Sequence, residues 1–369
     1  MIQILTSRYP NGSDLYAHAF VQTRAKLFAR KGLAVKVFVP SAVKSTDFDA
    51  GVTVVRAPVN QIIQELDVHE PVYLHLLNLQ FIGPVRTLPL YKFIFKNCSN
   101  LTIYFHGSEV QSYSPYLFDF TWSLREIAKL LYKNIMYMPV MRWIFKARKK
   151  NIKAIAPSNW MWNEAAENLN LEIEPRNIIP NSIERQFFDK FYENCERSDT
   201  DIIMVRPLTS RKYAVDIGLL IFSKLPEDYK LTIYGKGKLK SELTRLAVTL
   251  KVADRVTFID NFIEPNVMPQ IFSKFRFALM PSRMDAQGVT MCQMAASGCF
   301  VITTDSTAIP EFITPEYGIC LTDRDLENFD VVLNRIISGA SSSLRSKSRL
   351  LAMCSEHETI SKELKVLLS

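Results

Sequence analysis

Two cations follow one apolar run at a spacing suited to phosphate chemistry. The run Asp201–Arg206 is expected to form a strand, and Lys212 lies six residues after Arg206, where the next helix should begin. Ligands of open α/β sheets bind beyond the carboxyl ends of the strands. Fixed positive charges there can hold a diphosphate and stabilise the charge that it gains as a leaving group. A solvated basic loop is the alternative interpretation.

A glycine turn between a strand and a helix is the second candidate phosphate site. The apolar run 275–280 leads into PSRMDAQGVTMCQMAASG, where Gly288 lies at the expected start of a helix. Glycine at this point lets a phosphate approach the bare amides of a helix N-terminus. Asp285 precedes the turn, and Gln293 follows Asp285 by eight residues, or about two helical turns.

These segments resemble the signature of the retaining GT-B glycosyltransferases of family 4, the glycosyl transferases group 1. In that family a Pro-Ser pair precedes a Glu, with a Gly three residues on and a second Glu eight residues after the first. The resemblance covers about residues 176–325. The positions that match are Pro180-Asn181, Arg206, Lys212, Gly235-Lys236-Gly237, Pro281-Ser282, Gly288, Met294-Ala295, Gly298, Val301-Ile302 and Ile309-Pro310-Glu311.

Five positions depart from the family pattern. Asp285 replaces the first glutamate, and Gln293 replaces the second, which in the family holds the ribose hydroxyls. An amide still forms hydrogen bonds with hydroxyls but loses the charge-assisted contribution, about 1 kcal/mol. Ser182, Val205 and Tyr213 stand where glycine is usual.

The resemblance implies an α/β protein of GT-B architecture, with two doubly wound Rossmann-like domains facing a central cleft. It implies a hexosyltransferase-type reaction from a nucleotide-diphosphate sugar, without a metal ion or other cofactor and with retention at the anomeric carbon. The expected catalytic residues are His106, Arg206, Lys212 and Asp285. The expected donor-binding residues are Gly12, Arg206, Lys212, Gly235, Asp285, Ala286, Gln287, Gly288, Val289 and Gln293.

The N-terminal half matches the family more loosely. Gly12 lies in a Pro-Asn-Gly-Ser loop after the first apolar run, where the family has a glycine-rich loop that faces the donor. His106 ends the run 101–106 and resembles the family's histidine near the reacting carbon. His106 and Glu109 are therefore the expected acceptor-side residues. A hydrogen-bonded structural histidine is the alternative for His106.

Apolar runs of about five residues alternate with longer helical stretches, which is typical of parallel sheets covered by helices. We expect a first domain over 1–177, joined by a C-terminal helix at 350–369, and a second domain over 178–349. The serine-rich segment 338–349 is expected to be a flexible connector. The expected strands are 2–6, 34–39, 52–56, 72–76, 101–106, 152–156, 201–206, 231–234, 255–259, 275–280 and 300–304.

The charge balance favours anionic partners. The chain has 369 residues with a net charge of +8. Segment 129–153 is basic, lacks acidic residues and contains Tyr132, Tyr137, Trp143 and Phe145. It either docks on an anionic membrane surface or forms a core-facing helix with a solvated basic side. No base-stacking motif indicates nucleic acid.

Other features of the sequence indicate the cellular compartment in which the protein acts. No apolar run approaches the roughly 20 residues of a membrane span, and the N-terminus lacks signal-peptide features. Six scattered cysteines without a CxxC pair fit a reducing cytoplasm. Asp47, Asp49 and Asp119 are interpreted as ordinary surface residues.

The family's common use implies a saccharide or lipid-linked acceptor in surface-polysaccharide or lipopolysaccharide biosynthesis. The protein is expected in the cytoplasm, with peripheral attachment to the inner face of the cell membrane as a further expectation. A non-catalytic nucleotide-sugar-binding subunit and a GT-B nucleotide-sugar epimerase or hydrolase remain alternatives.

Overall fold

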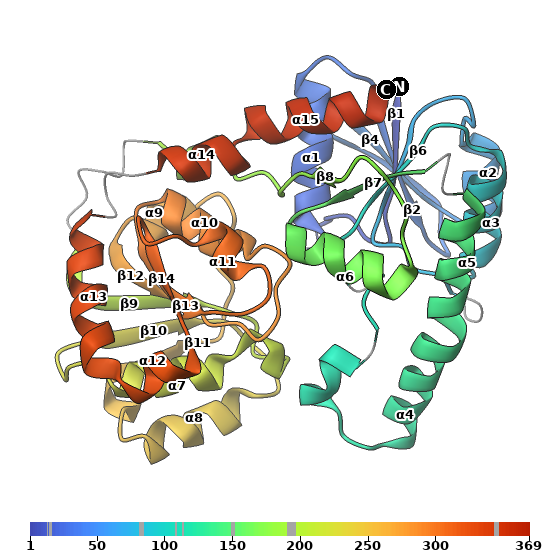
Figure 1. Cartoon of the computed structure of the whole chain (residues 1–369). Helices are drawn as coiled ribbons and strands as arrows, with labels where there is room; N and C mark the ends of the chain where they lie inside the picture. Colours follow the sequence, from blue (N-terminus) through green and yellow to red (C-terminus); the bar gives the residue numbers. More distant parts are fainter. Residues whose placement is uncertain are drawn as a thin grey trace. The chain divides into compact units, whose positions relative to one another are not determined.

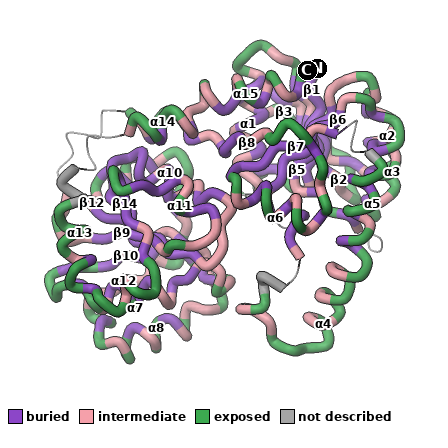
Figure 2. The backbone as a smooth tube through the Cα atoms, viewed as in Figure 1, coloured by how far each residue is buried: buried purple, intermediate pink, exposed green. Residues whose placement is uncertain are grey.

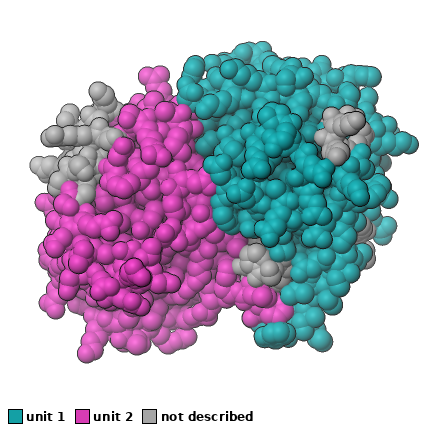
Figure 3. All heavy atoms as spheres, viewed as in Figure 1, with its two compact units in different colours: residues 1–115, 121–182, 356–369 teal, residues 116–120, 183–355 magenta. Residues whose placement is uncertain are grey.

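The chain divides into two compact units (Figure 3). Unit 1 comprises residues 1–115, 121–182 and 356–369, and unit 2 comprises 116–120 and 183–355. The computed structural model describes residues 1–12, 14, 17–80, 85–107, 109–112, 114–148, 152–189, 197–342 and 347–369. Residues 149–151 of the basic segment therefore lie outside the described part.

Unit 1 contains a sheet of order β3-β4-β2-β1-β5-β6-β7-β8 within its described residues. Every neighbouring pair is parallel except β3 with β4. The central strands β1, β5 and β6 are buried along their whole length, because helices cover both faces of a parallel sheet. The strands are β1 (Ile2–Leu5), β2 (Val35–Pro40), β3 (Ser45–Asp49), β4 (Val52–Ala57), β5 (Val72–His75), β6 (Leu101–Tyr104), β7 (Ile152–Ala156) and β8 (Asn177–Ile178).

Helices α1 and α15 lie side by side on one face of this sheet, and α2 and α3 cover the other (Figure 1). The helical segments of unit 1 are α1 (Ala19–Arg30), α2 (Val59–Glu65), α3 (Leu88–Asn97), η1 (Ser114–Asp119, ending in unit 2), α4 (Leu124–Leu131), η2 (Tyr132–Tyr137), α5 (Met138–Arg148), α6 (Asn159–Leu169) and α15 (Glu356–Leu368).

A buried ion pair fixes the C-terminal helix to unit 1. Arg24 of α1 and Glu363 of α15 are 2.7 Å apart, and both are almost fully buried. The hydroxyl of Tyr73 donates to the same carboxylate at 3.2 Å, and the Arg24 guanidinium lies 4.4 Å from the ring centroid of Tyr104. The last helix therefore completes the core of the first unit.

Unit 2 contains a parallel sheet of order β11-β10-β9-β12-β13-β14 in the described part of the chain. Helices α7 and α8 lie on one face, with α9 and α10 on the other (Figure 1). Burial is concentrated in the strands and the inward sides of these helices (Figure 2). The elements are η3 (Arg185–Phe187), β9 (Ser198–Val205), η5 (Arg211–Tyr213), α7 (Val215–Ser223), β10 (Lys230–Tyr234), α8 (Lys240–Thr249), η6 (Ala253–Arg255), β11 (Val256–Ile259), α9 (Met268–Phe272), β12 (Phe275–Leu279), α10 (Val289–Ala296), β13 (Phe300–Thr304), α11 (Ile309–Phe312), β14 (Gly318–Leu321), α12 (Asp323–Glu327), α13 (Phe329–Ser342) and α14 (Ser348–Cys354).

The structure differs from the sequence-based expectation near the C-terminus. The serine-rich segment is not a connector throughout, because α13 extends to Ser342 and α14 begins at Ser348. The expected single last helix is two helices, separated by Ser355 in an extended conformation. Of these two, α14 belongs to unit 2 and only α15 belongs to unit 1. Because β8 pairs with β7, unit 1 continues to Ser182 rather than ending at 177.

Candidate functional site

Arg206 lies immediately after β9 and is 5% exposed. Its Nη2 donates to the carbonyl oxygens of Met280 and Pro281, at 3.1 and 3.0 Å, so the next strand end orients the guanidinium. Its Nη1 lies 3.9 Å from Asp285, and its Nε is buried without a hydrogen-bond partner among the described residues. Burial lowers the pKa of Arg206, and the Asp285 carboxylate opposes that shift.

Lys212 and Arg206 meet at the ring of Tyr213. The Lys212 ammonium lies 5.0 Å from the ring centroid, and the Arg206 guanidinium carbon lies 5.9 Å from it. Within the described residues, the Lys212 ammonium makes no hydrogen bond or ion pair. The tyrosine that replaces a usual glycine thus attracts both cations to its ring through cation–π interactions.

Asp285 connects Arg206 to the start of α10. Its Oδ1 accepts the amides of Gln287 and Gly288, at 3.2 and 2.8 Å. Gly288 adopts a φ of 75°, which brings the chain into the helix. With these two amides engaged by Asp285, the amides of the first helical residues, beginning at Val289, are the ones placed to bind a phosphate.

Gly235 keeps two strand ends close together. A Cβ at this position would lie 1.9 Å from the carbonyl oxygen of Arg206. The amide of Arg206 donates to Tyr234 O, and that of Gly235 donates to Ile259 O. The Gly-x-Gly match therefore has a clear structural reason, which is close backbone approach at the loop that carries Arg206.

The side chains of the remaining expected donor-binding residues point in different directions. Gln287 is 2% exposed and its Nε2 donates to the Cys354 sulfur at 3.9 Å, so its side chain points into unit 2. Ala286 is half-buried between Asp285 and this buried side chain. Gln293, one turn into α10, donates from Nε2 to the Glu184 carboxylate at 3.1 Å.

Asp119 is not an ordinary surface residue, contrary to the sequence-based interpretation. It belongs to the segment 116–120, which clusters with unit 2. Its carboxylate accepts the Ser210 hydroxyl and, at 2.9 Å, the Arg211 amide, and so caps the turn that carries Lys212. Asp47 and Asp49 do form surface ion pairs, with Arg56 and Lys26.

In unit 1, the half-buried His106 pairs with the buried His75. Its Nε2 lies 2.9 Å from Nδ1 of His75, and its ring packs against Phe20 and Tyr104. Burial lowers the pKa of both histidines well below the usual range, and Arg24 adds to the shift. A neutral His106 held in this way keeps only Nδ1 for a substrate, so its proposed contact with substrate stays a prediction.

The other two expected residues of the N-terminal half are Glu109 and Gly12. Glu109 is 1% exposed and its carboxylate accepts the amide of His106, so it closes the loop after β6. Burial raises the pKa of Glu109. Gly12 is exposed, with open space around the position of a Cβ.

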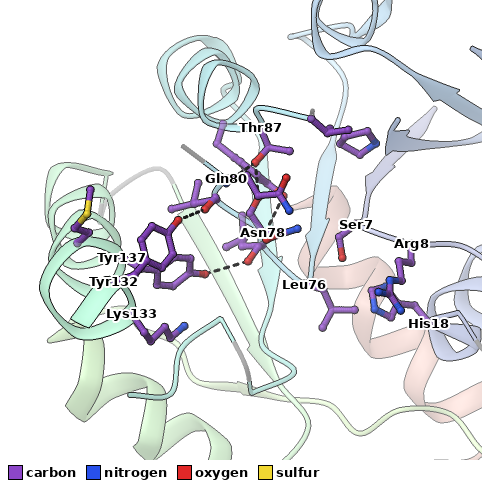
Figure 4. Close-up of a pocket in the computed structure, with 16 residues that line it drawn as sticks. Ser7, Arg8, His18, Leu76, Asn78, Gln80, Thr87, Tyr132, Lys133 and Tyr137 are labelled. Atoms are coloured by element: carbon purple, nitrogen blue, oxygen red, sulfur yellow. Dashed lines mark hydrogen bonds between the residues drawn. The ribbon is translucent and has the colours of Figure 1, made fainter. Parts of the chain in front are cut away.

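A pocket of about 990 Å³ opens at the carboxyl ends of β1, β2 and β5 in unit 1 (Figure 4). Arg8 and His18 lie on one side and Tyr132, Lys133 and Tyr137 on the other, with Asn78 between them. The hydroxyls of Tyr132 and Tyr137 donate to the carbonyls of Leu79 and Leu77, which fixes the segment after β5. We call this space the strand-end pocket.

The strand-end pocket is positively charged. Arg8 and Lys133 line it, and none of the described lining residues is acidic. Lys133 lies 3.7 Å from the ring centroid of Tyr137. Burial lowers the pKa of Lys133 to about 8, although Glu109 opposes the shift. Together with the hydroxyls and the amides of Asn78 and Gln80, these cations suit a polar, negatively charged ligand.

Comparison with solved structures identifies the architecture. The chain is similar to sucrose-phosphate synthase from Thermosynechococcus elongatus (14% identity, TM-score 0.69, 99% of this chain and 97% of that chain). It is similar to WaaG, a glycosyltransferase involved in lipopolysaccharide biosynthesis. The identity is 13% and the TM-score 0.66, and the match covers 100% of this chain and 99% of that chain. It is also similar to HepE of Anabaena in complex with UDP. The identity is 12% and the TM-score 0.69, and the match covers 100% of this chain and 99% of that chain.

The family model of glycosyl transferases group 1 matches residues 199–338. The match spans β9 to α13 and includes the Arg206 and Lys212 pair and the start of α10. The chain is a glycosyltransferase of the GT-B fold. A comparison with curated protein sequences finds no match.

Sequence reasoning missed several residues of this glycosyltransferase. Arg8 comes shortly after the end of β1, as Arg206 does after β9. A cation just beyond a strand end is a sequence signal that could have identified Arg8. Lys133 was seen only as part of a basic segment, because its contact with the pocket depends on how η2 packs. Glu184 comes shortly after the Pro-Asn turn, but its pairing with Gln293 had no sequence signal.

The basic segment is partly core and partly surface in the glycosyltransferase. Tyr137 and Phe145 are buried, whereas Trp143 is 69% exposed. Helix α4, which precedes this segment's η2 and α5, buries none of its residues and extends away from the sheet (Figures 1 and 2). No helix in the described part of the chain is long and apolar enough to cross a membrane.

Proposed function

We propose that this glycosyltransferase moves a hexosyl group from a nucleotide-diphosphate sugar to a saccharide or lipid-linked acceptor, with retention and without a metal ion. The observation that carries the proposal is the convergence of Arg206 and Lys212 on Tyr213, beside the start of α10. These cations and the first amides of α10 take the place of a metal by stabilising the diphosphate as it leaves. The UDP and glucose that accompany HepE in its complexes support a donor of this class.

The reaction exchanges one bond at the anomeric carbon for another on the same face. The bond to the diphosphate oxygen breaks as the bond to the acceptor oxygen forms, and the acceptor proton passes to the leaving diphosphate. Asp285 and the backbone of Ala286 contact the sugar hydroxyls, and His106 lies near the reacting carbon. Among the described residues, no group of three or more His, Cys, Asp or Glu side chains could hold a metal ion, and metal independence itself stays a prediction.

The strand-end pocket is the proposed acceptor site. Its size suits a sugar, and Arg8 and Lys133 favour an acceptor that carries a phosphate or carboxylate. WaaG, a structural neighbour, acts in lipopolysaccharide biosynthesis, which supports a role in surface-polysaccharide or lipopolysaccharide assembly.

We further propose that the protein binds the cytoplasmic face of an anionic membrane through α4, η2 and α5. Exposed apolar side chains there alternate with exposed cations, as at other lipid-facing helices. The exposed apolar residues are Trp122, Leu124, Leu131, Ile135, Met136 and Trp143. Liposome flotation should show binding that needs anionic lipid and is lost in Ile135→Ser with Trp143→Ala. The control variant Phe48→Ala, which removes an exposed aromatic side chain from β3, should still bind the liposomes.

The enzymatic proposal is tested by incubating the protein with UDP-, GDP- and ADP-sugars and phosphorylated or lipid-linked acceptors in the presence of a chelator. Transfer with the donor's anomeric configuration in the product is expected. Donor turnover without an acceptor would instead indicate a hydrolase or epimerase. Transfer that stops when the chelator is added would contradict metal independence.

A further inference from the structure

The carboxylate of Asp119 bridges two groups at the start of η5, the short helical turn that carries Lys212. It accepts the hydroxyl of Ser210 and, at 2.9 Å, the amide of Arg211. The Ser210 hydroxyl has only one hydrogen to donate, but its oxygen can still accept, and it accepts the amide of Lys212 at 3.2 Å. A continuous chain of hydrogen bonds therefore runs from Asp119 through Ser210 to the backbone of Lys212.

The turn is anchored from a second side by Arg283. The amide of Arg283 donates to the carbonyl of Lys212 at 2.8 Å, and its Nη1 donates to the carbonyl of Arg211 at 2.6 Å. Two hydrogen bonds to the carboxylate of Asp216, at 2.8 and 2.6 Å, orient that guanidinium. Because both sets of contacts reach the main chain around Lys212, they set the point from which its side chain extends.

The turn ends in a residue that requires such anchors. Ala214 is buried, follows η5 directly and adopts a φ of 51°. A residue with a Cβ is disfavoured in this left-handed region, and it persists there only where the surrounding contacts determine its conformation. Loss of one anchor is therefore expected to let the turn relax and to move the ammonium of Lys212, which lies 5.0 Å from the ring centroid of Tyr213.

Asp119 belongs to a short excursion of the chain. The chain leaves unit 1 after Pro115 and returns to it at Thr121, and the residues between them cluster with unit 2. We infer that Asp119 is a positioning residue for donor binding, because its carboxylate holds η5 where Lys212 meets the diphosphate. The inference rests on the proposed contact between Lys212 and the donor diphosphate.

This arrangement couples nucleotide binding to the segment 116–120. If the docked segment strengthens diphosphate binding, then a bound diphosphate must stabilise the docked segment by the same factor. The full chain bound to the tightest ligand among UDP, GDP and ADP should therefore show slower amide hydrogen exchange across 116–120 than the free chain. A purely structural role of Asp119 would leave exchange in this segment unaffected by the nucleotide.

A double-mutant cycle measured by isothermal titration calorimetry tests the route through Lys212. With the tightest of the three diphosphates, Asp119→Ala should weaken binding about tenfold, a typical effect for a residue that acts on a ligand without contacting it. Asp119→Asn, which keeps a hydrogen-bond acceptor, should weaken binding less. In a Lys212→Ala background, Asp119→Ala should have little further effect, because the ammonium that it positions is already absent. Asp199→Ala, which breaks an ion pair with Arg276 at the start of β9, should bind as wild type does.

Unchanged affinity in Asp119→Ala would overturn the inference. An equal loss in the presence and in the absence of the Lys212 side chain would also overturn it, because Asp119 would then act by another route. If Asp119→Ala does not fold, as judged by thermal unfolding, Ser210→Ala breaks the same chain of hydrogen bonds and carries the same expectations. If wild type binds none of the three diphosphates, the proposed donor class is refuted, and the inference falls with it.

Discussion

Arg206 and Lys212 lie against the same aromatic ring, although six residues separate them in the chain. Their charged groups are 5.9 and 5.0 Å from the ring centroid of Tyr213. Of the two, only Arg206 donates to carbonyls of the described residues, so the two cations should respond differently to mutation.

Lys212→Ala should lower kcat/KM by about a hundredfold with little change in stability, because the half-exposed ammonium acts on the leaving diphosphate. Arg206→Ala should lose similar activity and also about 1–3 kcal/mol of unfolding free energy, because the buried carbonyls of Met280 and Pro281 each lose a hydrogen bond. Steady-state transfer and urea denaturation measure the two effects. Lys274→Ala, an exposed lysine of unit 2, is the control. Normal activity in Lys212→Ala would contradict the proposed role.

Gly235→Ala should destabilise the protein by about 1–3 kcal/mol and weaken donor binding, because its Cβ would overlap the carbonyl of Arg206. Gly12→Ala should leave stability unchanged, since nothing lies within 4 Å of the added atom. Thermal unfolding compares the two variants. Any loss of activity in a stable Gly12→Ala protein would then reflect a direct role of that loop at the donor, and unchanged activity would remove Gly12 from the site.

Arg8→Met and Lys133→Met should raise the KM for a phosphorylated acceptor about tenfold and leave the KM for the donor unchanged. The reason is that both cations line the strand-end pocket of unit 1, the proposed acceptor site, whereas the proposed diphosphate contacts belong to unit 2. Initial rates measured at varied acceptor concentration test this. Lys129→Ala, on the exposed face of α4, should behave as wild type. Equal effects on both substrates would argue against the pocket as the acceptor site.

Glu363→Gln should cost about 3–5 kcal/mol, because it leaves the charge of Arg24 buried without its partner. Glu65→Gln, which breaks the more exposed pair with Lys36, should cost less than about 1 kcal/mol. Chemical denaturation gives both values. A small effect of Glu363→Gln would mean that α15 contributes little to unit 1.

Stability should fall as the pH drops below about 6.5. The unfolded chain protonates its histidines near that pH, whereas burial lowers the pKa of His75 and His106 in the folded state. The unfolded state then binds more protons, so acid favours unfolding, and above this pH the effect is absent. His75→Gln should give a shallower decline in melting temperature between pH 7 and 5. His357→Gln, at an exposed histidine, should match the wild-type slope.

The sequence indicated most of the fold, because the apolar runs that form the buried parallel strands are continuous and distinct. It missed β3, a short and mostly exposed antiparallel edge strand of polar residues, and β14, which is only four residues long. The polar residues of β3 give no apolar run, and β14 begins with a glycine, a residue depleted in strands.

The proposed donor site was partly predictable as a cluster of residues, because they follow strands that run in one direction. That rule, together with the glycine turn at Gly288 and the family resemblance, predicted that Arg206, Lys212 and Asp285 lie at one edge of the sheet. Asp119, which caps the turn that carries Lys212, and Glu184, which accepts from Gln293, could not be predicted. Both come from segments that are distant in the sequence. The paired state of His106 likewise depends on His75 in the neighbouring strand, which no local pattern reveals.

The most direct test of the account is a crystal structure of the protein with its tightest-binding nucleoside diphosphate. We expect both phosphates to lie within hydrogen-bond distance of Arg206, Lys212 and the first amides of α10. Phosphates bound elsewhere, for example against Arg8 and Lys133 in the strand-end pocket, would contradict it.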